Sequence, residues 1–315
     1  MAESDEARSQ FRAGLLYGLI AYVIWGLIPL YFHAVAYVAA GEILAHRIVW
    51  SFPILLVLVA GLRGGLAKLR AVLLDRRLVA ILLGSAALLS INWLLYIYAT
   101  ITHRVAEASL GYYMLPLVNA FLATLFLGER LRPAHYPALG LIALGVAIPF
   151  AVVGDFTWLA VALPVSFGCY GLVRKMVPVD SLTGLTVETL LMLAPATGYL
   201  AHCEVEAKSA FGPDRTTNAL LMLSGVLTVV PLLTYTLSIR RIPLLTQAFI
   251  QFVSPSVQFV LAVFVMREPM PPERWAAILC VWVAVLLFIA DAARAAQSAR
   301  RSRAASPELA SAAAE

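Results

Sequence analysis

Three ionisable residues lie close together inside an otherwise apolar stretch of the chain, residues 41–61. Glu42, His46 and Arg47 occupy the first third of this stretch, which is long enough to cross a bilayer as a helix of about 20 residues. A charge near the centre of such a helix costs at least about 2.5 kcal/mol, so it usually contacts a partner, a substrate or an ion. The pattern indicates a substrate or ion pathway or, alternatively, pairing with neighbouring helices.

Each of these side chains could take a different part in transport. The planar guanidinium of Arg47 is suited to holding an anionic group of a substrate. Glu42 and His46 are four residues apart and share one helix face, and Glu188 lies roughly 10 Å into another apolar helix. Burial can bring a carboxyl or an imidazole into the titrating range. Glu42, His46 and Glu188 are therefore candidates for proton coupling.

Further polar and aromatic residues occur within the apolar stretches and could line the same cavity. Amide side chains could contact a substrate or simply bond helix to helix; these are Asn92, Asn119, Gln247 and Gln251. Aromatic side chains could stack on a planar substrate or serve as packing and interface anchors; these are Tyr22, Trp25, Trp93 and Tyr112.

The composition identifies the class of protein that must position these residues. Of the 315 residues, 62% are hydrophobic and only 13% are charged, whereas soluble domains are about 25% charged. The apolar stretches are about twice as long as the strands of a membrane barrel. The sequence therefore predicts an all-α polytopic membrane protein. The net charge of +5 indicates basic cytoplasmic loops and not a nucleic-acid partner.

Several function classes lack the sequence patterns that they require. The cysteines, Cys169, Cys203 and Cys280, are scattered, so neither a metal site nor a disulfide framework is indicated. The sequence contains no GxxxxGK[ST], HExxH or GxSxG pattern. We therefore expect no cofactor, no metal, no catalytic residue and no enzymatic activity. An intramembrane enzyme and a non-transporting scaffold or sensor are kept as alternatives to a transporter.

The apolar stretches predict ten transmembrane helices, divided into two halves of five. Residues 13–153 form the first repeat and residues 154–291 the second, between a cytoplasmic tail at 1–12 and a disordered cytoplasmic tail at 292–315. Most of the 23 lysine and arginine residues fall on the side of the two termini. Because basic loops stay in the cytoplasm, both termini are expected to be cytoplasmic.

The two halves align with each other, which indicates a duplication. A shift of 139 residues places Pro116 on Pro255 and Glu129 on Glu268, and a shift of 142 places His46 on Glu188. Five helices are an odd number, so the second half enters the membrane from the opposite side. Such inverted five-helix repeats are typical of secondary transporters, whose central site lies at the repeat interface.

Six segments of the sequence resemble the RarD branch of the EamA-like families, within the drug/metabolite transporter superfamily. They are AYVIWGLIPLYF (21–32), EILAHRIVWS (42–51), NWLLYIYA (92–99), EASLGYYMLPLVN (107–119), FLGERL (126–131) and YGLVRK (170–175). The resemblance implies a ten-helix permease of the bacterial inner membrane. It also implies a central cavity lined mainly by helices 1–4 and 6–9, with helices 5 and 10 supporting packing or a homodimer.

From the residues and the resemblance together, we expect a secondary active transporter. Its substrate would be a small amphipathic metabolite or drug, moved across the lipid bilayer by export and coupled to protons. The residues expected at the cavity are Trp25, Glu42, His46, Arg47, Asn92, Tyr112, Asn119, Glu188, Gln247 and Gln251.

Overall fold

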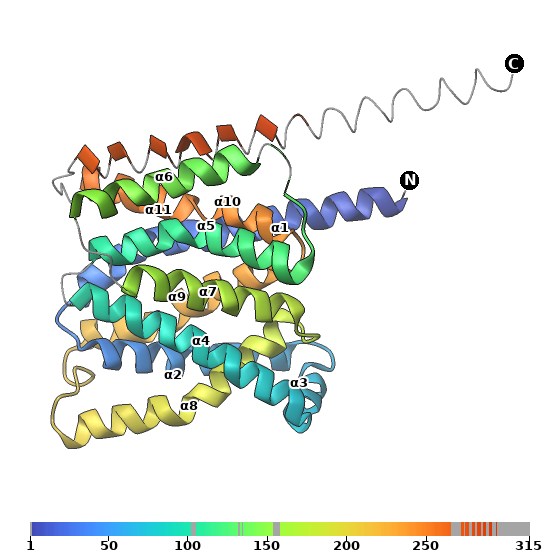
Figure 1. The fold of residues 1–315 in the computed structure, drawn as a ribbon. Coiled ribbons are helices and arrows are strands. Elements are labelled where there is room, and N and C mark those ends of the chain that lie inside the picture. Colours follow the sequence, from blue (N-terminus) through green and yellow to red (C-terminus); the bar gives the residue numbers. More distant parts are fainter. Residues whose placement is uncertain are drawn as a thin grey trace, which may run out of the picture. The chain divides into compact units, whose positions relative to one another are not determined.

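Helices joined by short loops make up the chain in the computed structural model (Figure 1). The structure describes residues 2–101, 105–131, 133, 135–153 and 158–265, and short stretches between 272 and 294. The helices are α1 (Ala2–Ala34), α2 (Ala40–Gly61), α3 (Gly65–Leu74), α4 (Arg76–Ile101), α5 (Val105–Leu127), α6 (His135–Val153), α7 (Trp158–Met176), α8 (Ser181–Val205), α9 (Arg215–Ile239), α10 (Leu244–Ile250), α11 (Val253–Val260) and the π-helix η1 (Leu261–Val265).

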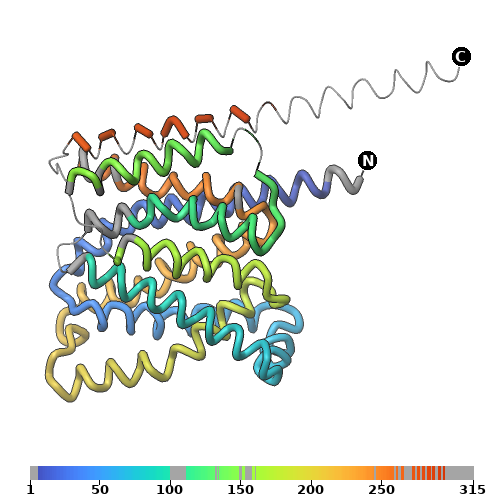
Figure 2. Tube along the Cα trace, in the orientation of Figure 1, coloured from blue at the N-terminus to red at the C-terminus, as the bar shows by residue number. Residues whose placement is uncertain are grey.

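The helices fall into two compact units. The first contains α1 to α5 and α7 to η1, which can be followed along the trace in Figure 2. The second contains α6 and the described residues between 272 and 294, and within it His135 Nε2 lies 3.9 Å from Asp291 Oδ2. Much of the predicted tenth helix, and all of the predicted tail at 292–315 except Arg294, lie outside the described residues.

Four of the described helical segments are long and apolar enough to cross a membrane. They are Glu6–Ala34, Ala40–Gly61, Arg76–Ala99 and Arg215–Ile239. Large apolar side chains remain on the outer face of these helices, as Val57 does with 69% of its surface exposed. An apolar outer face on helices of this length is what a bilayer requires, because lipid offers no partner to polar groups. The chain is a polytopic helical membrane protein.

Two helical segments were not expected from the sequence. α1 begins at Ala2, so residues 2–12 continue the first helix instead of forming an irregular tail. This stretch has no Pro or Gly, and extending an existing helix needs no new nucleation. The short helix α3 occupies the basic loop after α2, where Gly64 takes the left-handed conformation that begins it.

The predicted ninth helix, 244–266, is not continuous. It is divided into α10, α11 and η1, with a break at Gln251 and Phe252. Pro255 has no backbone N–H, so it cannot bond to the Gln251 carbonyl as a helix requires. The N–H of Ser254 donates to that carbonyl instead, at 3.2 Å, and the chain tightens locally. The break is therefore a consequence of Pro255 and places Gln251 at an irregular turn.

Candidate functional site

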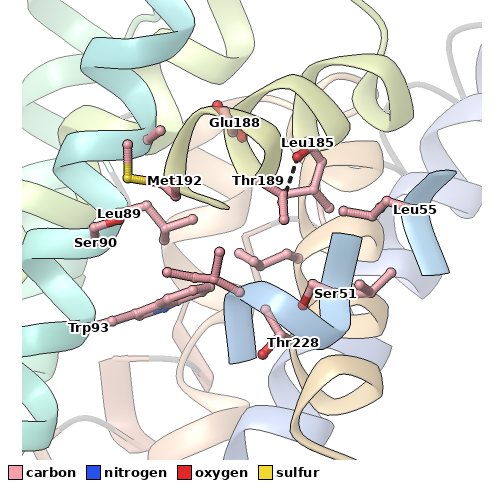
Figure 3. A pocket seen from close by; sticks show the side chains of 14 residues that line it. Ser51, Leu55, Leu89, Ser90, Trp93, Leu185, Glu188, Thr189, Met192 and Thr228 are labelled. Atoms are coloured by element: carbon pink, nitrogen blue, oxygen red, sulfur yellow. Dashed lines mark hydrogen bonds between the residues drawn. The ribbon is translucent and has the colours of Figure 1, made fainter. Parts of the chain in front are cut away.

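A cavity lies among α2, α4, α8 and α9 in the first unit (Figure 3). It is lined by Ile48, Ser51, Leu55, Ala86, Leu89, Ser90, Trp93, Leu185, Glu188, Thr189, Met192, Thr228, Val229 and Leu232. Its volume of about 30 Å³ has room for roughly two water molecules. Sites for organic ligands are about 300 Å³ or larger, so a substrate can enter only if these helices move apart.

Arg47 does not line this cavity but contacts two of the residues that do, Thr228 and Trp93. Its Nε donates to Thr228 Oγ1 at 2.9 Å, and its guanidinium carbon lies 4.3 Å from the centre of the Trp93 ring. The side chain is only 5% exposed. Among the residues that the structure describes, no carboxylate lies within ion-pair distance of Arg47. A buried cation of this kind favours an anionic ligand.

A close approach of α2 and α9 brings Thr228 to Arg47. A side chain at Gly225 would place its Cβ 2.6 Å from the backbone carbon of Trp50, so glycine permits the two helices to touch there. Ser51 Oγ donates to the Arg47 carbonyl and lies 3.3 Å from the Gly225 carbonyl. Thr228, one helical turn after Ser224, in turn donates to the Ser224 carbonyl, which leaves its oxygen free to accept from Arg47.

Glu42 and His46 do not line the cavity. Glu42 Oε1 accepts from the backbone N–H of Ala210 at 2.7 Å and of Phe211 at 3.3 Å, and from Ser209 Oγ at 3.2 Å. The His46 ring stacks on Phe211 with centroids 5.1 Å apart. Both side chains therefore hold the loop between α8 and α9 against the start of α2.

The tautomer of His46 follows from its partner on the same helix. Trp50 Nε1 lies 3.2 Å from His46 Nδ1, and an indole N–H can only donate. Nδ1 is thus the acceptor, and the proton of a neutral imidazole is on Nε2, which lies 3.9 Å from Glu42 Oε1. Among the described groups, Nε2 has no hydrogen-bond partner.

Glu188 lines the cavity and also belongs to a buried charge pair. Its Oε1 accepts from Ser85 Oγ at 2.6 Å and lies 3.6 Å from Arg174 Nε. Arg174 is fully buried in the last turn of α7. The neighbouring Lys175 has other partners, since its Nζ donates to the carbonyls of Ile239 and Ile242.

The remaining predicted residues connect helices outside the cavity. Asn92 Nδ2 donates to the Leu163 carbonyl at 2.9 Å, and Tyr112 donates to Asn92 Oδ1 at 3.4 Å. Asn119 Nδ2 donates to Gln251 Oε1 at 3.3 Å. These side chains thus join α4 to α7, α5 to α4 and α5 to the break after α10.

Gln247 and Trp25 lie at the contacts that α1 makes. Gln247 Oε1 lies 2.8 Å from Ser238 Oγ, and its amide nitrogen lies 3.4 Å from the Tyr22 hydroxyl. The Trp25 ring packs against Tyr22 and Tyr235 in an aromatic cluster. Of the ten predicted residues, only Glu188 lines the cavity that the structure describes, and Arg47 contacts two of its lining residues.

Comparison with known proteins identifies the family. The EamA-like transporter family matches residues 12–150. An uncharacterized transporter of Vibrio cholerae is 40% identical over 93% of this chain and 97% of that protein. Protein RarD of Streptomyces exfoliatus is 39% identical over 95% of this chain and 94% of its own length. The chain belongs to the RarD branch of the EamA-like transporters.

The fold of this RarD-family chain is shared with a solved protein of distant sequence. A crystal structure with a TM-score of 0.67 and 19% identity covers 88% of this chain and 97% of that one. The expectation from the sequence motifs is confirmed at the level of the family: the chain is a multi-pass bacterial membrane transporter of the drug/metabolite superfamily. The count of ten helices and the inverted repeat stay predictions.

Three residues important to the site of this RarD-family transporter were missed by sequence reasoning: Ser85, Arg174 and Thr228. Ser and Thr are common in membrane helices as helix-to-helix donors, so their type alone indicates nothing about a cavity. Arg174 differs from the other two because a sequence pattern could have indicated it: a basic residue that precedes a glycine near the start of the next helix. In the structure this glycine, Gly184, leaves room for the Arg174 guanidinium.

Proposed function

We propose that this RarD-family protein exports a small amphipathic organic anion across the bacterial inner membrane by secondary active transport, with the proton as coupling ion. The observation that supports the substrate's charge is Arg47. Its buried guanidinium contacts Trp93 and Thr228, which line the cavity, and no described carboxylate neutralises it. An anionic group of the substrate would supply the missing counter-charge.

The cavity lining supports an amphipathic substrate. Most of the lining side chains are apolar, from Ile48 on α2 to Leu232 on α9, and Trp93 offers an aromatic face. Four hydroxyl groups lie among them, those of Ser51, Ser90, Thr189 and Thr228. A predominantly apolar site with a small number of polar groups is typical of sites that bind small organic molecules.

Proton coupling is supported by Glu188, a carboxyl group that lines the cavity. The sequence has no ATP-binding P-loop pattern, so an ion gradient is the expected source of energy. Export as the direction rests on the resemblance of the six sequence segments. We expect Glu188→Gln to exchange substrate across the membrane but to lose accumulation driven by a pH gradient, because an amide cannot titrate.

The substrate-binding role of Arg47 can be tested without knowing the natural substrate. Matched pairs of aromatic carboxylates and their neutral amides, for example phenylacetate and phenylacetamide, are added to the purified protein and the melting temperature is measured. We expect carboxylates to raise the melting temperature and amides of the same shape to have no effect, because ligand binding stabilises the folded state by mass action.

Two variants and a control complete this experiment. Arg47→Lys keeps the charge but loses the planar fork, so binding should weaken while the fold survives. Arg47→Gln should abolish the difference between carboxylate and amide. Arg70→Gln removes an exposed charge from α3 and should behave as the parent. If the Arg47 variants retain the carboxylate preference and transport as the parent does, the anion is held elsewhere. If the parent itself moves no solute in liposomes, a scaffold or enzyme role is correct.

A further inference from the structure

A second buried arginine, Arg174, contacts the carboxyl group that lines the cavity. Arg174 extends from the end of α7, and Glu188 lies two turns into α8. Neither residue is solvent-exposed, with exposed fractions of 0% and 2%. A side chain at Gly184 would collide with the Arg174 guanidinium, so the α8 backbone forms a close-fitting slot for it. The ion pair therefore joins two helices beside the cavity.

This ion pair is incomplete. Arg174 Nε lies 3.6 Å from Glu188 Oε1, which takes its short hydrogen bond from Ser85 instead. Arg174 Nη2 donates to the Ser181 carbonyl at 3.1 Å. Among the described groups, Arg174 Nε, Arg174 Nη1 and Glu188 Oε2 have no hydrogen-bond partner. A buried pair overcomes the cost of desolvation only when such atoms are satisfied, so little holds this pair together beyond its opposite charges.

The surroundings of Glu188 leave Arg174 as its one counter-charge among the described residues. Arg174 and Tyr170 face it from α7, and Ser85 faces it from α4. Ser51 of α2 and Thr228 of α9 share its cavity and carry no charge. Removing Arg174 from Glu188 would therefore leave a lone carboxylate in an apolar cavity, which a proton can neutralise.

We propose that Arg174 is a positioning residue for proton coupling, an internal cation that alternates with the transported proton at Glu188. In the state described here Arg174 neutralises the carboxylate. In the other state a proton from water binds Glu188 Oε2, the carboxylic acid forms, and Arg174 keeps its own proton and separates from Glu188. The charge of the pair changes from zero to +1 in this step. This inference rests on the proton-coupled function proposed above.

The alternation gives a physical reason for coupling proton uptake to helix movement. Once Glu188 is neutral, Arg174 is a buried cation without a counter-ion, which is strongly unfavourable. The carbonyl that it already contacts, Ser181, begins α8 at the loop after α7. A shift of the guanidinium toward this loop, where Asp180 is exposed, loosens the contact between α7 and α8 beside the cavity.

The experiment titrates Glu188 directly, without substrate. Infrared difference spectra of the purified protein are recorded across a pH series, and the band of a buried carboxylic acid is assigned to Glu188 by its absence in Glu188→Gln. In Arg174→Gln, we expect this band to persist to a pH about 1–3 units higher than in the parent, since an adjacent opposite charge favours the ionised carboxyl by about that amount. Arg174→Lys should restore most of the parent titration.

Transport provides the readout that a merely structural pair would not change. In liposomes we expect Arg174→Gln to keep substrate exchange but to lose pH-driven accumulation, and Arg174→Lys to recover part of it. Lys175→Gln removes a neighbouring cation that bonds elsewhere and serves as the control. If Arg174→Gln proves too unstable, Ser85→Ala removes the hydrogen bond to Oε1 and should shift the same band in the same direction, by less.

The inference is overturned if the Glu188 band titrates identically in the parent, Arg174→Gln and Ser85→Ala. A purely structural pair would also overturn it. In that case the single variants lower the melting temperature, the double variant Arg174→Gln/Glu188→Gln restores it, and Arg174→Gln has the same pH profile of transport as the parent. The two proposals can also fail separately. If the Glu188 band shifts in Arg174→Gln but the protein binds no carboxylate probe, the anionic substrate class is rejected and the role of Arg174 is retained.

Discussion

The guanidinium carbon of Arg47 lies 4.3 Å from the centre of the ring of Trp93, so the buried cation rests on the aromatic face of a residue that lines the cavity. The ring of Phe32 lies further away, at 5.8 Å. An aromatic face attracts a cation through its quadrupole, most strongly when water is excluded. This contact orients the guanidinium edge and leaves it available to an anionic ligand.

Replacing Trp93 with Leu should weaken binding of the carboxylate probes. Loss of the ring removes a cation–π contact of about 0.5–2 kcal/mol, or roughly 2- to 30-fold in dissociation constant. Trp93→Phe should have a smaller effect because it keeps an aromatic face. Trp158→Leu at the exposed start of α7 is the matched control. Equal affinities of the parent and Trp93→Leu by calorimetry would argue against this orientation of Arg47.

Gly225→Ala should destabilise the protein by about 1–3 kcal/mol, as overpacking does. The new Cβ would lie 2.6 Å from the backbone carbon of Trp50, where α2 and α9 touch. Gly198→Ala in α8 meets nothing within 4 Å and should stabilise by about 0.5–1 kcal/mol through helix propensity. Melting temperatures in detergent compare the two. Equal shifts would mean that α2 and α9 are further apart than described.

Glu42→Gln should retain pH-driven transport, whereas Glu42→Ala should loosen the loop at Ser209 to Phe211. Glutamine keeps an oxygen that can accept from the N–H groups of Ala210 and Phe211, and alanine removes it. A hydrogen bond to a charged acceptor contributes about 1.5–3 kcal/mol. Faster amide hydrogen exchange at Ala210 in Glu42→Ala is the expected signal. Loss of accumulation in Glu42→Gln would return Glu42 to the proton pathway.

Acid should weaken the start of α9 through Asp214. The Thr217 hydroxyl and the backbone N–H groups of Thr217 and Thr216 donate to this carboxylate and lower its pKa from the ordinary value of 3.8. A lowered pKa contributes stability above 3.8 that is lost as the pH falls through the folded-state value. Asp214→Asn keeps an N-cap but should lose this acid dependence, measured by hydrogen exchange at Thr217 between neutral and acidic pH.

Both termini are expected to be cytoplasmic, because most lysine and arginine residues fall on their side of the membrane. Alkaline phosphatase and a fluorescent protein are fused in parallel after residue 315 and within the loop near Lys208. We expect fluorescence from the terminal fusion and phosphatase activity from the loop fusion. The reverse pattern would overturn this topology, and with it the inverted arrangement of the two predicted repeats.

The sequence predicted only in part where helices continue and where they break. The apolar stretch that became α2 was identified closely, because length and hydrophobicity decide whether a segment can cross lipid. The interruption before Pro255 could not be predicted in the same way. Pro53 is also a proline within an apolar stretch, yet α2 continues through it without a break. A proline only removes one donor, and neighbouring segments decide whether the helix bends or divides.

The membrane class, the family and the presence of buried charges at Arg47 and Glu188 were predictable from the amino-acid sequence, because each depends on residue type and on the length of apolar runs. Their contacts followed from the tertiary structure alone. Thr228 reaches Arg47 from α9, and Arg174 reaches Glu188 from α7, whereas Glu42, which shares α2 with Arg47, holds a loop. Helical periodicity places a side chain on a face, but the helix that covers this face is chosen by long-range packing, which a local pattern does not contain.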